Sequence, residues 1–223
     1  MNNITKMMLS AAAALGLAVP VQAQYVNGDL LAGFTSGTSD FIMDLGPYSS
    51  LSLGETWNVG ANLGSQFGGV TQFGVVGSLN LGQLIFATSP DSAENGFKPQ
   101  GLFTPARANV ATLAQGSLTA GSFAILSPAL TYSWTYQTAQ TAGTPGNTFQ
   151  NNFFNPNVSV DSTAYLFENA NSGTVTAENT FTYNNTSGEL SYQVVPEPGT
   201  VSLLAVLGLL GLTVRRRRVG RDK

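Results

Sequence analysis

Apolar and polar residues alternate with a period of two through much of the chain between residues 24 and 195. This alternation is typical of β-strands that bury one face. A clear example is LTYSWTYQ at 130–137, and the turn-forming segment 184–188 separates two further runs as in a hairpin. The strands predicted in this way cover 29–34, 40–45, 73–81, 84–88, 122–126, 130–136, 162–167, 175–183 and 190–194.

Helical periodicity is scarce in the same region. Residues 105–114 are the better helix candidate, with a proline in the first turn, and 58–67 is a shorter one capped by Asn58. Residues 138–157 are rich in Thr, Gly, Pro and Asn and predict a long surface loop. We therefore expect a mainly β body, an antiparallel sandwich or jelly-roll-like domain with one or two short helices.

The N-terminal segment departs from the alternation. Lys6 precedes an apolar stretch over 7–19, which ends at Pro20 and the small residue Ala23. This order is typical of a secretory signal peptide, here residues 1–23, forming a helix and cleaved after Ala23 by signal peptidase. An N-terminal membrane helix is the alternative, and the short apolar run disfavours it.

A second apolar segment lies near the C-terminus, at 200–214, and Arg215–Arg218, Arg221 and Lys223 follow it. Fifteen helical residues reach about 22 Å, whereas the hydrocarbon core is about 30 Å thick, so a single transmembrane helix here is short. Arginines that snorkel to the boundary reduce the mismatch. Carrying each arginine to the bilayer centre costs about 2.5–3.5 kcal/mol, so we expect the basic end, 215–223, to stay cytoplasmic while the body crosses.

The triplet Pro196-Glu197-Pro198 stands before this segment. The triplet, the apolar helix and the arginine cluster, in this order over 194–223, resemble the PEP-CTERM sorting signal of Gram-negative bacteria. The resemblance implies recognition by an exosortase, a membrane-embedded processing enzyme that cleaves near the triplet. The two prolines suit this role, because they keep the peptide extended and out of the neighbouring sheet and helix. A plain tail anchor without cleavage remains the alternative.

Composition limits what the exported body, 24–193, can do. Hydrophobic residues make up 43% of the chain, enough for a core, whereas charged residues make up 9%, against about 25% in typical soluble domains. Cysteine is absent, which excludes disulfides, and so is histidine, the commonest general base and metal ligand. Between residues 24 and 195 ten acids face two cations, a net charge of −8, which disfavours nucleic-acid binding.

Carboxylates are the remaining candidates for catalytic or metal-binding groups. Asp40 and Asp44 would share a strand face with Cα atoms about 13 Å apart, wider than the roughly 5–9.5 Å between glycosidase carboxyl groups. We expect both side chains to be solvated. Asp91, Glu94 and Asn95 could cup a calcium ion, but their spacing matches no known ligand frame, and a polar turn is expected. The sequence thus predicts no catalytic residue, no metal ligand and no cofactor.

Aromatic residues provide a further candidate surface. Tyr132, Trp134 and Tyr136 would lie on one strand face, where exposed rings stack on sugars. In a small β domain such a stripe usually belongs to the core, and we favour that interpretation. Phe153 and Phe154 lie in the Asn-rich loop as a cap or a contact patch.

We expect a non-enzymatic exported protein of the cell envelope or extracellular matrix with a structural or adhesive body. It would pass transiently through the inner membrane, C-terminus in the cytoplasm, before reaching the cell surface or exterior. Its expected partners are signal peptidase and the secretion machinery, an exosortase, the membrane and, as a candidate, extracellular polysaccharide. A secreted carbohydrate-active protein that uses carboxylates and a permanently membrane-anchored periplasmic binding module are the alternatives. The predicted functional residues are Ala23 for signal cleavage, Pro196, Glu197 and Pro198 for sorting, and Arg215, Arg216, Arg217 and Arg218 for orientation.

Overall fold

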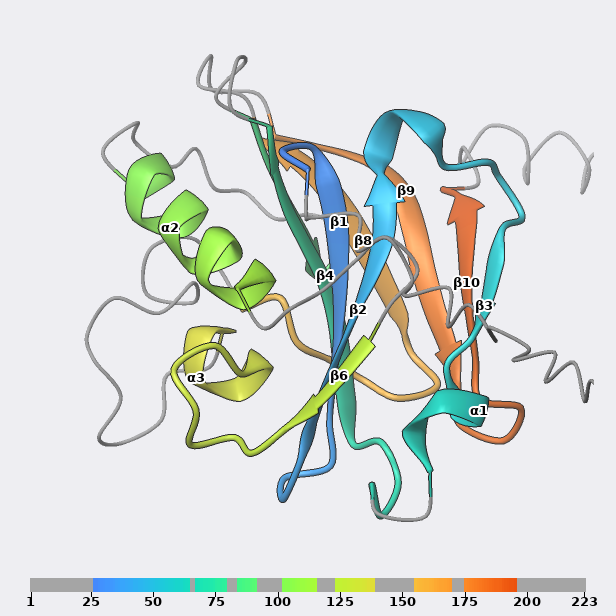
Figure 1. Cartoon of the computed structure of the whole chain (residues 1–223). Helices are drawn as coiled ribbons and strands as arrows, with labels where there is room; N and C mark the ends of the chain where they lie inside the picture. The colour runs from blue at the N-terminus through green and yellow to red at the C-terminus, as the bar shows by residue number, and fades with distance from the viewer. Residues whose placement is uncertain are drawn as a thin grey trace, which may run out of the picture.

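The computed structural model describes residues 26–64, 67–79, 84–91, 102–115, 123–138, 155–169 and 175–195. These residues form one curved antiparallel sheet of ten strands, with helices against one face (Figure 1). The strands are β1 (Asp29–Thr35), β2 (Asp40–Pro47), β3 (Thr56–Asn58), β4 (Gln72–Leu79), β5 (Leu84–Ser89), β6 (Phe123–Leu126), β7 (Val158–Ser159), β8 (Thr163–Asn169), β9 (Val175–Asn184) and β10 (Glu189–Val194). The helices are η1 (Tyr48–Ser50), α1 (Gly60–Leu63), α2 (Phe103–Ala114) and α3 (Trp134–Thr138).

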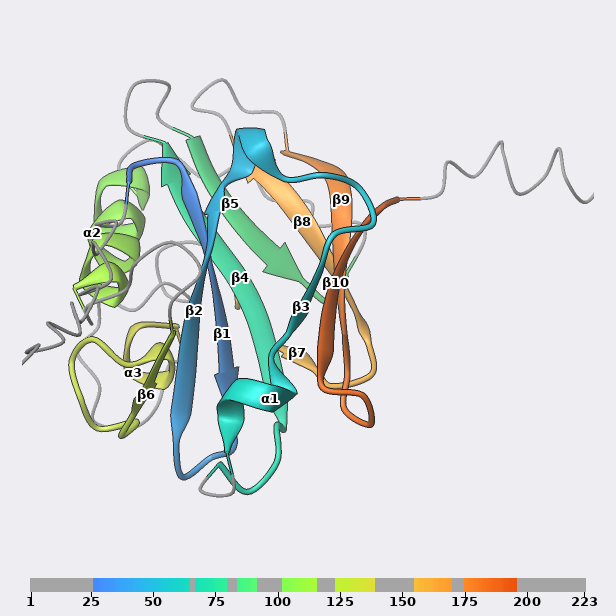
Figure 2. The ribbon, with the colours of Figure 1, turned by 45° about the vertical axis from the view of Figure 1, so that its right-hand side comes forward.

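All ten strands belong to one continuous sheet, and this corrects the expectation of a sandwich of two sheets. Its strand order is β3-β10-β9-β8-β5-β4-β1-β2-β6, and β7 pairs with β4. The strands bend around an interior into the shape that we call the half-barrel (Figure 2). The prediction of a mainly antiparallel β body is confirmed. The predicted terminal helices, at 1–23 and 200–214, lie outside the described residues.

The alternating pattern has produced two hydrophobic cores, one on each face of the sheet. The larger core fills the half-barrel, where rings from distant strands meet. Phe34 of β1 lies 5.1 Å from Tyr183 of β9, and Tyr48 lies 4.4 Å from Phe86 of β5, both between ring centroids. The second core lies between the outer face and helices α2 and α3 and includes Leu31, Ile42, Val76, Phe103, Val110 and Trp134. Because both faces are covered, all seven residues of β1 are buried.

Most predicted elements are confirmed, with one clear error. The expected strand at 130–136 does not form, because α3 begins at Trp134 and turns precede it. Helix α2 begins at Phe103, two residues before the predicted start. The predicted helix 58–67 is reduced to α1, which ends where Gly64 takes φ of +64°. Asn58 still acts as expected, because its Oδ1 accepts a hydrogen bond from the Ala61 N–H at 3.1 Å.

Two paired glycines explain why Trp134 leaves the strand pattern. Gly33 of β1 and Gly74 of β4 are register partners, and the Trp134 indole lies over them. A Cβ at Gly33 would overlap the indole ring. One at Gly74 would overlap the Pro156 carbonyl oxygen and lie 3.0 Å from Trp134 Cζ2. The indole N–H donates to Asn157 Oδ1 at 2.6 Å, so the ring is buried with its polar atom satisfied. The core interpretation of Trp134 is therefore confirmed.

A buried carboxylate anchors α3 to the sheet. Thr135 donates to Asp40 of β2 through its backbone N–H, at 2.6 Å to Oδ2, and through its hydroxyl, at 2.7 Å to Oδ1. From the other side of α3, Gln137 accepts a hydrogen bond from Asn109 of α2 at 2.7 Å. Helix α3 therefore connects the sheet to α2 by buried polar contacts, which a strand at this position would not make.

We predict that Gly33→Ala lowers the free energy of unfolding more than Gly37→Ala does. At Gly33 the new methyl group collides with a buried indole, and overpacking costs about 1–3 kcal/mol or more. Gly37 is a matched control, because a Cβ there meets nothing within 4 Å and only its φ of +83° is strained, at roughly 1 kcal/mol. Urea unfolding measures both losses, and equal losses would contradict the packing of Trp134 on Gly33.

Candidate functional site

Three aspartates lie on the face of the sheet that the helices cover. Asp29 is 1% exposed, and Asp40 and Asp44 are 0% exposed. The expectation that Asp40 and Asp44 are solvated is therefore wrong, because the second core and its helices cover this face. The two residues share the face, as predicted, but they have different neighbours: Asp40 is opposite Thr35 on β1 and Asp44 is opposite Leu31. Both oxygens of Asp40 are already bonded to Thr135.

Asp44 instead has Asp29 as its charged neighbour. The register of β1 and β2 shifts between Leu30 and Leu31, so that Leu30 pairs with Gly46 and Leu31 with Asp44. Leu45 is the extra residue of this bulge, which displaces Asp44 along the strand toward Asp29. Burial, together with the negative charge of Asp29, raises the pKa of Asp44 to about 6, although the hydrogen bond from the Gly46 N–H acts in the opposite direction. Burial also raises the pKa of Asp29.

Each carboxylate of this pair has one bonded oxygen and one orphaned oxygen. The Gly46 N–H donates to Asp44 Oδ1 at 2.8 Å, and the Val26 N–H donates to Asp29 Oδ2 at 2.7 Å. The remaining oxygens, Asp29 Oδ1 and Asp44 Oδ2, are buried and have no hydrogen-bond partner. Sequence reasoning missed this pair, since fifteen positions separate the residues and only the bulge brings them together.

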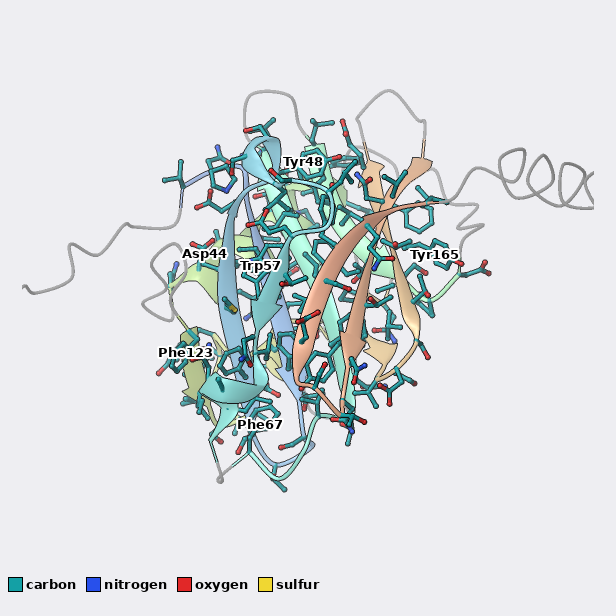
Figure 3. The ribbon with its side chains drawn as sticks, turned by 90° about the vertical axis from the view of Figure 1, so that its right-hand side faces the viewer. Asp44, Tyr48, Trp57, Phe67, Phe123 and Tyr165 are labelled. Atoms are coloured by element: carbon teal, nitrogen blue, oxygen red, sulfur yellow. The ribbon has the colours of Figure 1, made fainter. Side chains whose placement is uncertain are left out.

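A separate depression lies at one end of the half-barrel, between α1 and the turn that joins β9 to β10. Its volume is about 370 Å³, and Gly60 and Gly188 meet beside it with a hydrogen bond of 2.8 Å from N to O. Figure 3 shows Phe67, which lines the depression, at the end of the half-barrel opposite Tyr48. Buried apolar side chains form its inner part, and exposed polar side chains of the turn form its rim. The lining includes Leu63, Phe67, Val70, Tyr183, Asn185, Thr186 and Ser187.

Several other predicted candidates are not assembled by the described structure. Tyr132 lies in a turn and Tyr136 lies within α3, and both are partly buried, so the aromatic strand face does not exist. Of the suggested calcium loop, only Asp91 is described, and Glu94 and Asn95 lie outside the described residues, as do Phe153 and Phe154. Within the described ranges no three acidic side chains gather as a metal-binding group.

The sorting residues also lie beyond the described part of the chain. This holds for Ala23, for Pro196, Glu197 and Pro198, and for Arg215, Arg216, Arg217 and Arg218. What the structure describes is the point where the chain leaves the sheet. Val194 is the last residue of β10, pairs with Asn179 and is 49% exposed. None of the helices in the described segments has the length and apolar character to cross a membrane.

Comparison with known proteins bears on the segment that follows this exit. Residues 194–218 match the family model of the PEP-CTERM protein-sorting motif, which spans the triplet, the apolar segment and the arginine cluster. No curated protein and no solved structure matches the chain. The match implies an exported protein that passes the membrane and is processed by an exosortase-type membrane protein. The chain thus carries a PEP-CTERM protein-sorting motif at residues 194–218.

Proposed function

We propose that this protein is a non-catalytic component of the cell envelope or extracellular matrix, whose body is released by cleavage near the Pro-Glu-Pro triplet. One observation carries the proposal: the sorting motif begins at Val194, the residue at which β10 ends. The triplet follows only two residues later, so cleavage there removes the apolar tail and leaves every strand of the half-barrel intact. The product is a complete folded body with no membrane anchor.

The carboxylate chemistry of the body supports a structural role over a hydrolytic one. Acid-based glycoside hydrolysis needs two carboxyl groups that reach a sugar from a cleft. Asp40 is bound to α3, and the Asp29–Asp44 pair is buried under the helix-covered face. Among the described residues that line the depression between α1 and the β9–β10 turn, none is acidic.

The rim of the depression supports an adhesive contribution. Asn185, Thr186 and Ser187 are exposed there and offer hydroxyl and amide groups, which suit hydrogen bonding to polysaccharide. Trp134 is fully buried and cannot stack on a sugar, so the contact would be polar. Binding of extracellular polysaccharide at this rim is part of the proposed function.

We predict that the mature wild-type protein ends near Pro198 and lacks the arginine cluster. Replacing Arg215–Arg218 by glutamine removes the charges that hold this end in the cytoplasm, at about 2.5–3.5 kcal/mol each, and should abolish most of the processing. Intact-mass spectrometry of the protein from the producing cells measures both results.

The double variant Arg221→Gln and Lys223→Gln is the control for this experiment. Both residues lie beyond the matched segment, which ends at position 218, so processing should continue. A wild-type chain that still carries Lys223 at its C-terminus would contradict cleavage and favour a permanently anchored binding module.

We predict that Asn185→Ala combined with Thr186→Ala weakens polysaccharide binding about 5-fold or more, because each of the two lost hydrogen bonds is worth roughly 0.5–1.5 kcal/mol. Glycan-array and pull-down measurements test this. Ser49→Ala is the control, since Ser49 is exposed and follows Tyr48 in η1, and Figure 3 shows Tyr48 at the end of the half-barrel opposite Phe67. Unchanged binding in the double variant, or no binding by the wild type, would argue against adhesion at the rim.

A further inference from the structure

The Asp29–Asp44 pair has a feature that neither the fold nor the sorting signal requires. Two carboxylates have been taken out of water together, although burying an ionised carboxylate costs several kcal/mol unless it is paired. An orphaned buried acceptor adds roughly 1–3 kcal/mol to that cost. Asp40, on the same strand and face, shows the ordinary solution, since both its oxygens accept hydrogen bonds. Asp29 Oδ1 and Asp44 Oδ2 have no such partner.

The backbone around the pair holds both carboxylates in place. Asp44 lies at the bulge, where its Oδ1 is bonded to the N–H of Gly46, a residue with φ of +86°. Asp29 lies at the start of β1, where its Oδ2 is bonded to the Val26 N–H. Each side chain is therefore oriented through one oxygen while the other stays available. Figure 3 shows Asp44 on β2, in the half of the molecule that carries Tyr48.

Two fixed and available carboxylate oxygens are ligands for a hard divalent cation. We propose that Asp29 and Asp44 bind a calcium ion between them, with Asp29 Oδ1 and Asp44 Oδ2 as its two carboxylate ligands. Calcium takes six to eight oxygen ligands and uses backbone carbonyls and water beside carboxylates, so two acidic residues suffice to begin such a site. The ion neutralises both charges and satisfies both orphaned oxygens at once, whereas a proton shared between the two oxygens would leave one negative charge.

Calcium suits this site better than the other common metals. The chain has neither cysteine nor histidine, the ligands that zinc and copper prefer. Magnesium demands near-octahedral geometry and gives up its water reluctantly, which disfavours a buried site with two protein carboxylates. Calcium sites of extracellular modules have dissociation constants of about 10⁻⁴–10⁻³ M. An exported protein needs no tighter site, and we expect an affinity in this range.

The test is calcium binding by the full-length chain, purified in a non-ionic detergent and freed of metal with a chelator. Titration calorimetry with calcium chloride should give one site per chain, and calcium should raise the thermal unfolding midpoint more than the same concentration of magnesium. Asp44→Asn and Asp29→Asn keep the size of the side chain and remove one charge. Each should weaken binding by roughly 10-fold or more, because affinity follows the charge of the ligands.

Asp161→Asn is the matched control, because it makes the same chemical change at an exposed acid. Asp161 has φ of +58°, a conformation that asparagine accepts, and its Oδ1 accepts a hydrogen bond from the Asn185 N–H at 2.9 Å. Its calcium affinity should equal that of the wild type. Equal weakening in the control and in Asp44→Asn would mean diffuse binding to the acidic surface and would overturn the proposal, as would no binding by the wild type.

Protons provide a second measurement that needs no variant. Protons and calcium compete for the Asp44 carboxylate, whose pKa without the ion is raised to about 6, so lowering the pH from 7 to 5 should weaken calcium binding. Without calcium, the folded state holds more protons than the unfolded state between about pH 4 and 6, so stability should fall as the pH rises through this range. Asp29 and Asp40 have shifts in the same direction and act with it. Saturating calcium should remove most of this fall, and a fall that calcium leaves unchanged would overturn the proposal.

Discussion

The contact on which the helix-covered face depends is the Trp134 indole lying on two glycines of neighbouring strands. Because Gly33 and Gly74 are register partners without side chains, β1 and β4 leave a flat area in the middle of a crowded sheet. The indole fills it and reaches Asn157 with its N–H. Helix α3 is then held at a fixed place, and its next residue, Thr135, meets Asp40. Through Gln137 the same helix positions α2. The Trp134 ring thus positions the two helices, α3 and α2, that cover the outer face of the sheet.

That cover decides the environment of the acidic residues. A sheet with one solvated face would leave Asp29, Asp40 and Asp44 in water, where they would need no partner. Here the second core buries the side chains of the outer face, as the first core buries those inside the half-barrel. Asp40 meets the helix that creates the cover and is fully bonded by it. Asp29 and Asp44 are charged neighbours, and each has one buried oxygen without a hydrogen-bond partner. The same packing therefore produces a structural anchor and a candidate cation site on a single strand.

The sorting motif follows the last strand of the body without a spacer. This limits how far the body can lie from the apolar segment. The matched motif starts at the last residue of β10, and the triplet lies two residues beyond it. An extended chain spans at most about 3.3–3.6 Å per residue. Under the proposed function, the folded body is therefore held within a few residues of the membrane until the tail is removed. An enzyme that cuts near the triplet would then approach the edge of the sheet where β10 ends.

The sequence by itself determined the features that contiguous residues encode. The triplet, the apolar run and the arginine cluster were legible without a structure, and the alternating pattern placed most strands, because both depend on local order. Tertiary structure decided the rest. The stretch at 130–137 has a strand pattern, yet the glycines of β1 and β4 and the carboxylate of Asp40, 60 to 100 positions away, make it a turn and a helix. The Asp29–Asp44 pair arises from a one-residue bulge, which changes the register of two strands and leaves no mark in the spacing of the acids.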